Sequence, residues 1–264
     1  MLKIALDAGH ATNTPGKRCL KAIDPKQTRE WYLNDRIADK LEYLLKDYDC
    51  KVRRTDDTSG KEDISLQERV NIANAWEADV FISVHHDAGV GGKSGGGTTV
   101  YYCSSKEERA KQAQALYNAV TKETKLVGNR STKVKNYEYY VLKNTSMPAF
   151  LIENGFMDST SDTPIILTED HATKTAKGLL NFLVSTFGLK KLEAKAEVKK
   201  DNSYLVKVLV DNLNVRAGAG TNYKIHTVVQ KDQVFTITST SGSWGKLKSG
   251  AGWINISSKY VKKL

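Results

Sequence analysis

The sequence has no long hydrophobic run and little cysteine. No apolar stretch approaches the ~20 residues that a membrane-spanning helix requires. Lys3 is followed by only three apolar residues before Asp7, which is too short for the core of a secretory signal peptide. The cysteines are three, widely spaced and without a Cys-x-x-Cys pair: Cys19, Cys50 and Cys103. We therefore expect no membrane insertion, no export signal, and free buried thiols in place of a disulfide framework or a cysteine zinc site.

Acidic residues are scarce in the last quarter of the chain. The net charge of the 264 residues is +10, and residues 201–264 hold nine basic residues against three acidic ones, a net +6. Residues 191–200 add +2, which leaves +2 for the first 190 residues. A basic carboxy-terminal segment favours a polyanionic partner, and a well-solvated lysine surface is an equal alternative.

A charged segment with few large apolar residues, 189–202, separates two patterns and is predicted to be a linker. Before it, apolar strand-like runs alternate with amphipathic helical patterns. This predicts an α/β domain over residues 1–188, with a mainly parallel twisted sheet flanked by helices. After it, short runs separated by Gly, Asn, Asp and Ser predict a small all-β barrel or sandwich over residues 203–264.

The elements of the first domain follow from periodicity and capping residues. Ser65 and Ser105 each stand three residues before a glutamate, which is a capping-box pattern, and Thr168 and Gly188 are expected to cap the last helix. Strands are predicted at 3–7, 52–56, 79–86, 98–103, 138–143 and 148–154, and helices at 30–47, 65–76, 105–125 and 168–187.

Three residues with metal-binding or catalytic side chains follow apolar strands. His10 comes shortly after KIALD, His85 directly follows VFISV, and Glu153 directly follows AFLI. The carboxyl ends of strands form the rim where ligands bind in an open α/β sheet. A single histidine in such a place is more often structural, but these three side chains converge if their strands are parallel neighbours. The shared position of these three residues therefore favours a functional site.

Glu30 is a fourth candidate, because it begins the first helix on the same face as Leu33 and Ile37. A carboxylate on an inward-facing stripe is costly unless something pairs with it. The alternative is a glutamate in solvent that the helix dipole favours. Two histidines and one glutamate form the zinc set of hydrolases, and a second glutamate supplies a base. The spacings are long, so no local motif imposes this interpretation.

Several segments stand in a fixed order along the chain: LDAGH, EWYLN, LQERVNIAN, ADVFISVHHDA and NRSTKVKNYEYYVLKNTSMPAFLIENGFMD. Through them, residues 2–187 resemble the zinc-dependent N-acetylmuramoyl-L-alanine amidases of bacterial autolysins and phage endolysins. The first two segments are similar to the D-x-G-H and E-x-x-L-N motifs of that family. The others are similar to its R-x-x-x-A-N, S-x-H-x-N-A, N-R-G, V-L and P-A-x-L-x-E-x-G-F motifs. Their shared order makes the resemblance specific.

The resemblance implies that His10, Glu30 and His85 bind Zn²⁺ and that Glu153 is catalytic. Zinc would polarise the lactyl carbonyl of N-acetylmuramic acid and lower the pKa of its bound water toward ~7. Glu153 would take the proton of that water and pass it to the departing alanine nitrogen.

The chain departs from the family pattern at three positions. His86 stands where the family has a small residue, and we assign the ligand to His85 because it directly follows Ser-Val. His86 is then expected on the other face of the strand end. Asp87 replaces the usual Asn and Ser131 the usual Gly, and neither replacement removes a ligand.

Residues 204–264 resemble a bacterial SH3-like wall-binding module. The similarity lies in the leading LNVR, in Trp244, and in the Gly-Trp pair that ends at Trp253. We expect Trp253 in the core of this small barrel. Tyr223 and Trp244 would either stack on sugars or fill the barrel, and no wall-binding residue is assigned.

Other patterns are given structural interpretations. The glycine-rich stretch GVGGKSGGG is followed by a strand-like run, which argues against a phosphate-binding loop and favours a flexible loop at the rim of the site. His171 and His226 are expected on the surface.

Together these patterns predict a peptidoglycan hydrolase that cleaves the amide between N-acetylmuramic acid and L-alanine. A phage endolysin fits the missing signal peptide: it is made in the host cytoplasm and acts on the wall after release, with a host autolysin as the second source. Peptidoglycan and anionic wall polymers are the expected partners, without nucleic acid or membrane insertion. The alternatives are a zinc peptidase acting within the stem peptide and a non-catalytic wall-binding protein.

Overall fold

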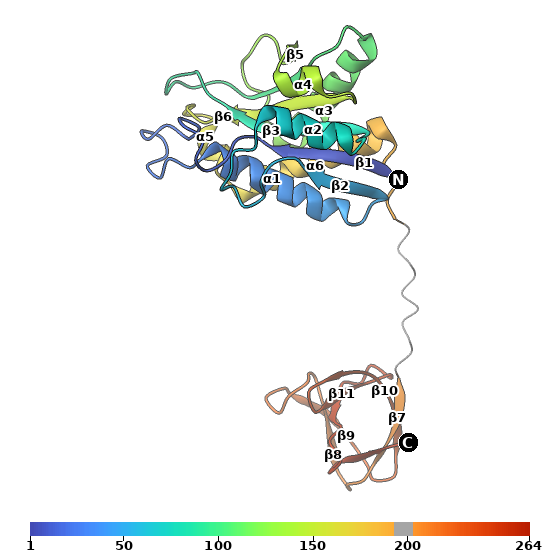
Figure 1. The fold of residues 1–264 in the computed structure, drawn as a ribbon. Coiled ribbons are helices and arrows are strands. Elements are labelled where there is room, and N and C mark those ends of the chain that lie inside the picture. Colours follow the sequence, from blue (N-terminus) through green and yellow to red (C-terminus); the bar gives the residue numbers. More distant parts are fainter. Residues whose placement is uncertain (193–202) are drawn as a thin grey trace. The chain divides into compact units, whose positions relative to one another are not determined.

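The computed structural model describes residues 1–192 and 203–264, which belong to two compact units, Met1–Leu192 and Glu193–Leu264 (Figure 1). Most of the linker predicted at 189–202 lies outside the described residues. Its first part pairs with the first unit, because the N–H of Asp49 donates to the carbonyl of Lys190 at 2.8 Å. Within the described parts of the chain, every helix is too short or too polar to span a bilayer.

The first unit is built on one six-stranded sheet with the strand order β2-β1-β3-β6-β4-β5. Neighbouring strands run parallel except for β4 and β6, which are antiparallel. The predicted α/β class with a mainly parallel sheet is therefore confirmed. The strands are β1 (Leu2–Ala8), β2 (Cys50–Arg54), β3 (Val80–Asp87), β4 (Thr98–Tyr102), β5 (Val134–Asn136) and β6 (Ala149–Phe156).

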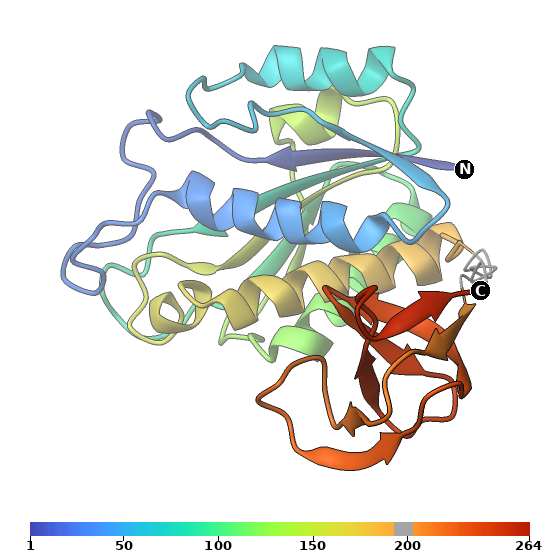
Figure 2. The same cartoon turned by 90° about the horizontal axis from the view of Figure 1, so that it is seen from below.

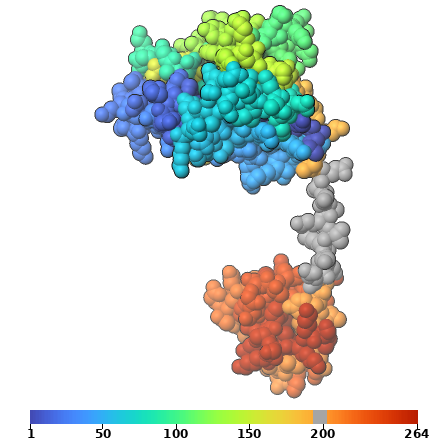
Figure 3. Space-filling view, viewed as in Figure 1, coloured from blue at the N-terminus to red at the C-terminus, as the bar shows by residue number. Residues whose placement is uncertain are grey.

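Helices cover both faces of this sheet because its side chains alternate between two apolar clusters. Val80, Ile82 and Val84 of β3 pack against α1 (Glu30–Leu45), α3 (Glu107–Thr124) and α6 (Glu169–Phe187). Phe81 points the other way, toward α2 (Leu66–Ala75) and α4 (Tyr140–Asn144). Figure 2 shows α1 and α6 running along the first face, and Figure 3 shows the regions of α2 (cyan) and α4 (yellow-green) side by side on the second. A short helix, α5 (Thr163–Ile166), precedes α6.

Two of the predicted helix starts have the expected caps. The side chain of Ser65 accepts a hydrogen bond from the N–H of Glu68, and that of Thr168 accepts one from His171. Gly188 ends α6 in the left-handed conformation, with φ of 66°. The predicted cap at Ser105 is wrong, because Lys106 is the residue that precedes α3 and its side chain makes no capping bond.

The strand predicted at 138–143 is also wrong, because the chain forms the short helix α4 there. The apolar run is too short to distinguish the two periods. Val141 and Leu142 are both buried in the cluster beneath α2, whereas consecutive strand residues would face opposite sides. The edge of the sheet is taken by β5, which pairs with β4.

The second unit is all-β, as predicted, and consists of one seven-stranded antiparallel sheet in the order β13-β7-β10-β11-β12-β8-β9. Its core contains Val206, Val215, Ile237 and Ile254. Trp253, expected in the core, is only half-buried, because alternation along β12 turns its neighbour Ile254 inward. The strands are β7 (Tyr204–Val208), β8 (Leu213–Arg216), β9 (Ile225–Val229), β10 (Val234–Ser241), β11 (Trp244–Leu247), β12 (Trp253–Asn255) and β13 (Val261–Lys263).

Candidate active site

The candidate site lies at the carboxyl ends of three adjacent parallel strands, β1, β3 and β6. His10 stands just beyond the end of β1, and His85 and Glu153 pair in register on β3 and β6. Parallel neighbours end at the same edge of a sheet, so the three side chains converge there. Glu30 reaches the same place from the first residue of α1.

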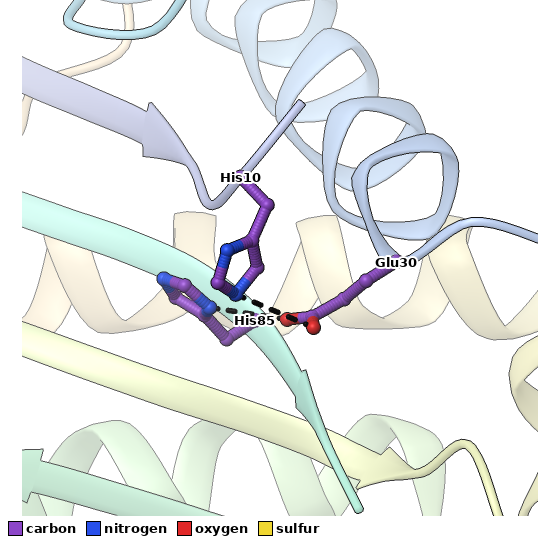
Figure 4. Close-up of side chains that lie close together, drawn as sticks. All are labelled: His10, Glu30 and His85. Atoms are coloured by element: carbon purple, nitrogen blue, oxygen red, sulfur yellow. Dashed lines mark hydrogen bonds and ion pairs between the residues drawn. The ribbon is translucent and has the colours of Figure 1, made fainter. Parts of the chain in front are cut away.

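His10, Glu30 and His85 form a compact cluster in which the ligand-type atoms lie within 4.8 Å of one another. Nε2 of His10 is 3.4 Å from Oε2 of Glu30, and Nδ1 of His85 is 3.1 Å from Oε1 (Figure 4). The Glu30 side chain is only 1% exposed. The inward-facing interpretation of Glu30 is therefore correct, and the solvent-exposed alternative is wrong.

The donor set of this cluster fits a zinc ion. Oε2 of Glu30 is buried and has no hydrogen-bond partner among the described residues. A buried carboxylate oxygen without a donor is costly, and a cation would relieve that cost. Two imidazoles and one carboxylate with an open fourth position are the ligands of catalytic zinc.

The charge states of His10 and Glu30 suit metal binding. Burial lowers the pKa of His10 to about 4, so the imidazole is neutral at physiological pH, as a ligand must be. Burial by itself would raise the pKa of Glu30, but the hydrogen bond and charge of His85 outweigh it and lower this pKa to about 2. Glu30 is therefore an anion over the whole physiological range. Burial by itself would lower the pKa of His85, but the hydrogen bond and charge of Glu30 outweigh it and raise this pKa, so that a metal ion must displace a proton from His85.

Glu153 lines the same pocket as this cluster but is not one of its members. Its Oε2 is buried and has no hydrogen-bond partner among the described residues. Burial raises the pKa of Glu153 to about 8 in spite of the opposing charge of His85, while Glu30 and Asp87 raise it further. A bound cation would lower this pKa by adding positive charge nearby. Such a poised carboxyl group is suited to take up and return a proton.

These four residues line one pocket of about 760 Å³. The pocket lies at the sheet edge, between the segment that leads into α1 and the segment that leads into α2. Its size is that of a small-molecule or cofactor site. Among the other residues that line it are Lys17, Asp63, Ser65, Arg69, Asp87, Tyr139, Tyr140 and Met157.

Comparisons with known proteins agree with this geometry. Residues 4–185 match the N-acetylmuramoyl-L-alanine amidase family, and residues 211–262 match the bacterial SH3 domain. The chain belongs to the N-acetylmuramoyl-L-alanine amidase family. The expected activity, that of a peptidoglycan amidase, and the expected SH3 domain are thereby confirmed.

Individual relatives of the amidase cover most of its length. The endolysin of Bacillus phage SPP1 is 31% identical over 97% of this chain and 96% of its own. The N-acetylmuramoyl-L-alanine amidase CwlM of Bacillus licheniformis is 30% identical over 83% of this chain and 82% of its own. The crystal structure of the N-acetylmuramoyl-L-alanine amidase from Clostridium difficile 630 is similar with a TM-score of 0.63 and 25% identity, over 71% of this chain and 97% of that one.

The amidase holds His10 in an uncommon backbone conformation, with φ of 66°. The guanidinium of Arg69 fixes this turn by donating to the carbonyl of His10 at 3.1 Å and to the carboxylate of Asp7 at 2.6 Å. Gly9 is required there, because a Cβ at this residue would lie 2.0 Å from the ring of His85. Sequence reasoning gave Arg69 no role. Its position on the same helix stripe as Ala73 was the signal that it faces inward.

His86 points away from the cluster, to the other side of β3. Its side chain is buried, and its Nδ1 lies 2.8 Å from the amide oxygen of Asn34. The amide nitrogen of Asn34 donates to the carbonyl of Gly9 at 3.0 Å, and the backbone N–H of His86 donates to Glu30. His86 and Asn34 thus support the site from behind, and Asn34 was not predicted to do so.

The prediction that His171 lies on the surface is wrong. This residue is 2% exposed, and its ring faces that of His86 with the centroids 6.3 Å apart. It occupies the buried stripe of α6 together with Thr175, one helical turn further on. His226, by contrast, is exposed on β9, as predicted.

The glycine-rich stretch begins directly after Ala88, which lines the pocket, and is followed by β4, so it is no phosphate loop. The sequence favoured a flexible loop, but the structure tethers it. The N–H groups of Gly89 and Gly91 donate to Asp158 at 2.9 and 2.7 Å, and that of Gly97 donates to Asp162. Asp87, at the start of this loop, pairs with Arg130 at 3.0 Å.

Proposed function

We propose that this amidase hydrolyses the bond between the lactyl carbonyl of N-acetylmuramic acid and L-alanine with one Zn²⁺ ion held by His10, Glu30 and His85. One observation carries the proposal: two imidazoles and a buried carboxylate converge within 4.8 Å of one another. A second glutamate, Glu153, whose Oε2 is buried, lines the same pocket. Family membership supports the same reaction.

The residues of the chain have separate tasks in this reaction. Bound zinc supplies a Lewis acid for the scissile carbonyl and for the attacking water. Glu153 accepts the proton of that water and delivers it to the departing alanine nitrogen. Arg69 and Gly9 hold His10 in place, and Asn34 and His86 fix the wall behind Glu30.

The SH3 unit would hold the enzyme on its insoluble substrate. Residues 201–264 carry a net +6, which suits anionic wall polymers in addition to peptidoglycan. The similarity to a phage endolysin along nearly the whole chain supports a role in lysis of the host wall. In that role the protein acts on the host cell wall, whose peptidoglycan is its substrate.

Two neighbouring histidine variants test the metal site. His85→Ala is expected to lose stoichiometric zinc, because it removes one of three ligands. His86→Ala is expected to keep most of the zinc, because its ring faces Asn34 on the other side of β3. Zinc per chain is measured by elemental mass spectrometry, with circular dichroism as the check that each variant is folded. Zinc retained by His85→Ala and lost by folded His86→Ala would contradict the assignment.

A further inference from the structure

The reaction pocket is lined by many acidic groups and, apart from its histidines, by two basic side chains, Lys17 and Arg69. Arg69 is 2% exposed, and a guanidinium has five N–H donors. All five are engaged, with acceptors on Ile64, Asp7, Ala8, His10 and Asp63. Arg69 therefore has no donor left for a ligand.

Lys17 is in the opposite situation. Its side chain is 46% exposed, and its ammonium lies 3.9 Å from Oε2 of Glu30, which is too far for a hydrogen bond. No hydrogen bond within the described parts of the chain uses the three donors of this ammonium. A metal ion bound to Glu30 would offset the carboxylate charge that attracts Lys17. Lys17 is thus the cation of this pocket that is free to bind substrate.

The backbone of Lys17 is fixed beside the site. Its carbonyl accepts a hydrogen bond from the N–H of Glu30 at 3.0 Å, and Arg18 forms a β-bridge with Arg29. Arg29 also donates to the carbonyl of Thr14 at 3.1 Å. The start of α1 therefore positions Lys17 and Glu30 together. Because this backbone anchor is already ordered, only the side chain of Lys17 has to be fixed when a ligand binds.

We propose that Lys17 binds a carboxylate of the stem peptide, and that the amidase therefore prefers stem peptides with a free carboxylate near the scissile bond to amidated ones. This inference rests on the proposed function, because it places the cleaved amide at the cluster. An extended chain advances about 3.3–3.6 Å per residue. A carboxylate on the second residue thus lies on the order of 7 Å from the cleaved bond, and Nζ of Lys17 lies 3.9 Å from Oε2 of Glu30 in the cluster where that bond is placed.

The charge of the pocket makes this preference specific. Asp63 and Asp87 also line the pocket, and each is already paired with an arginine, Asp63 with Arg69 and Asp87 with Arg130. Within the described parts of the chain, Lys17 is therefore the basic side chain of this pocket that has donors left to pair with a substrate carboxylate. A carboxamide at the same position has no charge to pair with the ammonium and gains less.

Two muropeptides that differ only in a free carboxylate or a carboxamide on the second stem residue test the inference. They are cleaved by the zinc-loaded full chain and by Lys17→Met, Lys17→Arg and Lys21→Met. Lys17→Met is expected to lower kcat/KM for the carboxylate substrate by about ten-fold, mainly through KM, so that the preference between substrates disappears. Lys17→Arg retains the preference, and Lys21→Met, which changes an exposed lysine of the same loop, behaves as wild type. Zinc content is measured in every variant.

Two results would overturn the assignment of Lys17. In the first, Lys17→Met cleaves both muropeptides with the wild-type preference. In the second, it slows both equally at full zinc occupancy, which would place Lys17 at the reacting centre and not at the peptide. Failure of the wild-type enzyme to cleave either muropeptide would overturn the proposed function itself. This result differs from the two above, in which the wild-type enzyme is active.

Discussion

Glu153 and Glu30 both line one pocket and both have a buried Oε2, but they differ in their place relative to the two histidines. Each has an Oε2 atom without a hydrogen-bond partner among the described residues, but only Glu30 belongs to the cluster with His10 and His85, and its Oε1 contacts His85 and the backbone N–H of His86. Glu30 is therefore assigned as ligand and Glu153 as base. Replacing a ligand by a neutral residue should lower the zinc content, whereas replacing a base should leave the zinc content unchanged.

Glu153→Gln tests this division of roles. The substitution preserves shape but cannot accept the proton, so we expect turnover of a soluble muropeptide to fall by about 10²–10⁴-fold. Zinc is expected to stay near one ion per chain, because the three ligands are intact. Both quantities are measured on the same preparation. Stoichiometric loss of zinc from this variant would show that Glu153 is a ligand.

At the scale of single residues, the sequence predicted where the candidate site residues lie better than it predicted the hydrogen bonds that support them. His10, His85 and Glu153 could be placed because each follows an apolar strand, and strand ends meet at one edge. The supporting contacts of Arg69 and Asn34 join segments 59 and 25 residues apart, which no local pattern records. His171 was misplaced because a histidine among the polar residues of a first helical turn gives no sign that His86 lies behind it.

At the scale of elements, helices α3 and α6 pack unusually closely at Gly178. A Cβ on this residue would lie 2.6 Å from Cα of Val120 and 3.0 Å from the carbonyl oxygen of Ala119, both in the backbone of α3. Backbone atoms cannot rotate aside as a side chain can. Any larger residue must therefore push the two helices apart.

Gly178→Ala is expected to destabilise the first unit in spite of better helix propensity. Alanine gains about 1 kcal/mol over glycine in a helix interior, whereas forced overpacking costs roughly 1–3 kcal/mol. We expect a net loss of up to about 2 kcal/mol in the free energy of unfolding, measured with urea. Ser185→Ala, on the exposed side of the same helix, is the control and should change little. Equal or greater stability of Gly178→Ala would contradict this packing argument.

Regular elements were predictable where a pattern was long. The helix α1 and the buried strands β3 and β6 lie close to their predicted bounds, since α1 carries a helical period over its length and each strand contains a continuous apolar run. The five-residue helix α4 was predicted as a strand because so short a run does not distinguish the periods. The antiparallel pairing of β4 with β6 depends on how the loops cross the sheet, which the patterns of single elements do not contain.

At the scale of the whole molecule, the proposed function assigns catalysis to the first unit and wall binding to the second. The pocket and its cluster lie within Met1–Leu192, while the excess positive charge lies mainly in residues 201–264. Residues 1–192 alone are expected to cleave soluble muropeptides as fast as the full chain but to lyse whole cells more slowly, because tethering raises the local substrate concentration. Turbidity of a cell suspension measures lysis. Unchanged lysis by residues 1–192 would remove the targeting role from the SH3 domain.

Mass spectrometry of purified walls digested by the zinc-loaded full chain tests the central claim most directly. Hydrolysis of the amide between N-acetylmuramic acid and L-alanine creates new amino-terminal alanine and leaves the number of reducing sugar ends unchanged. That product pattern is the one we predict, and it should be absent in digests by Glu153→Gln. New amino termini inside the stem peptide would instead show a peptidase using the same site, and the absence of any product would show a wall-binding protein without catalysis.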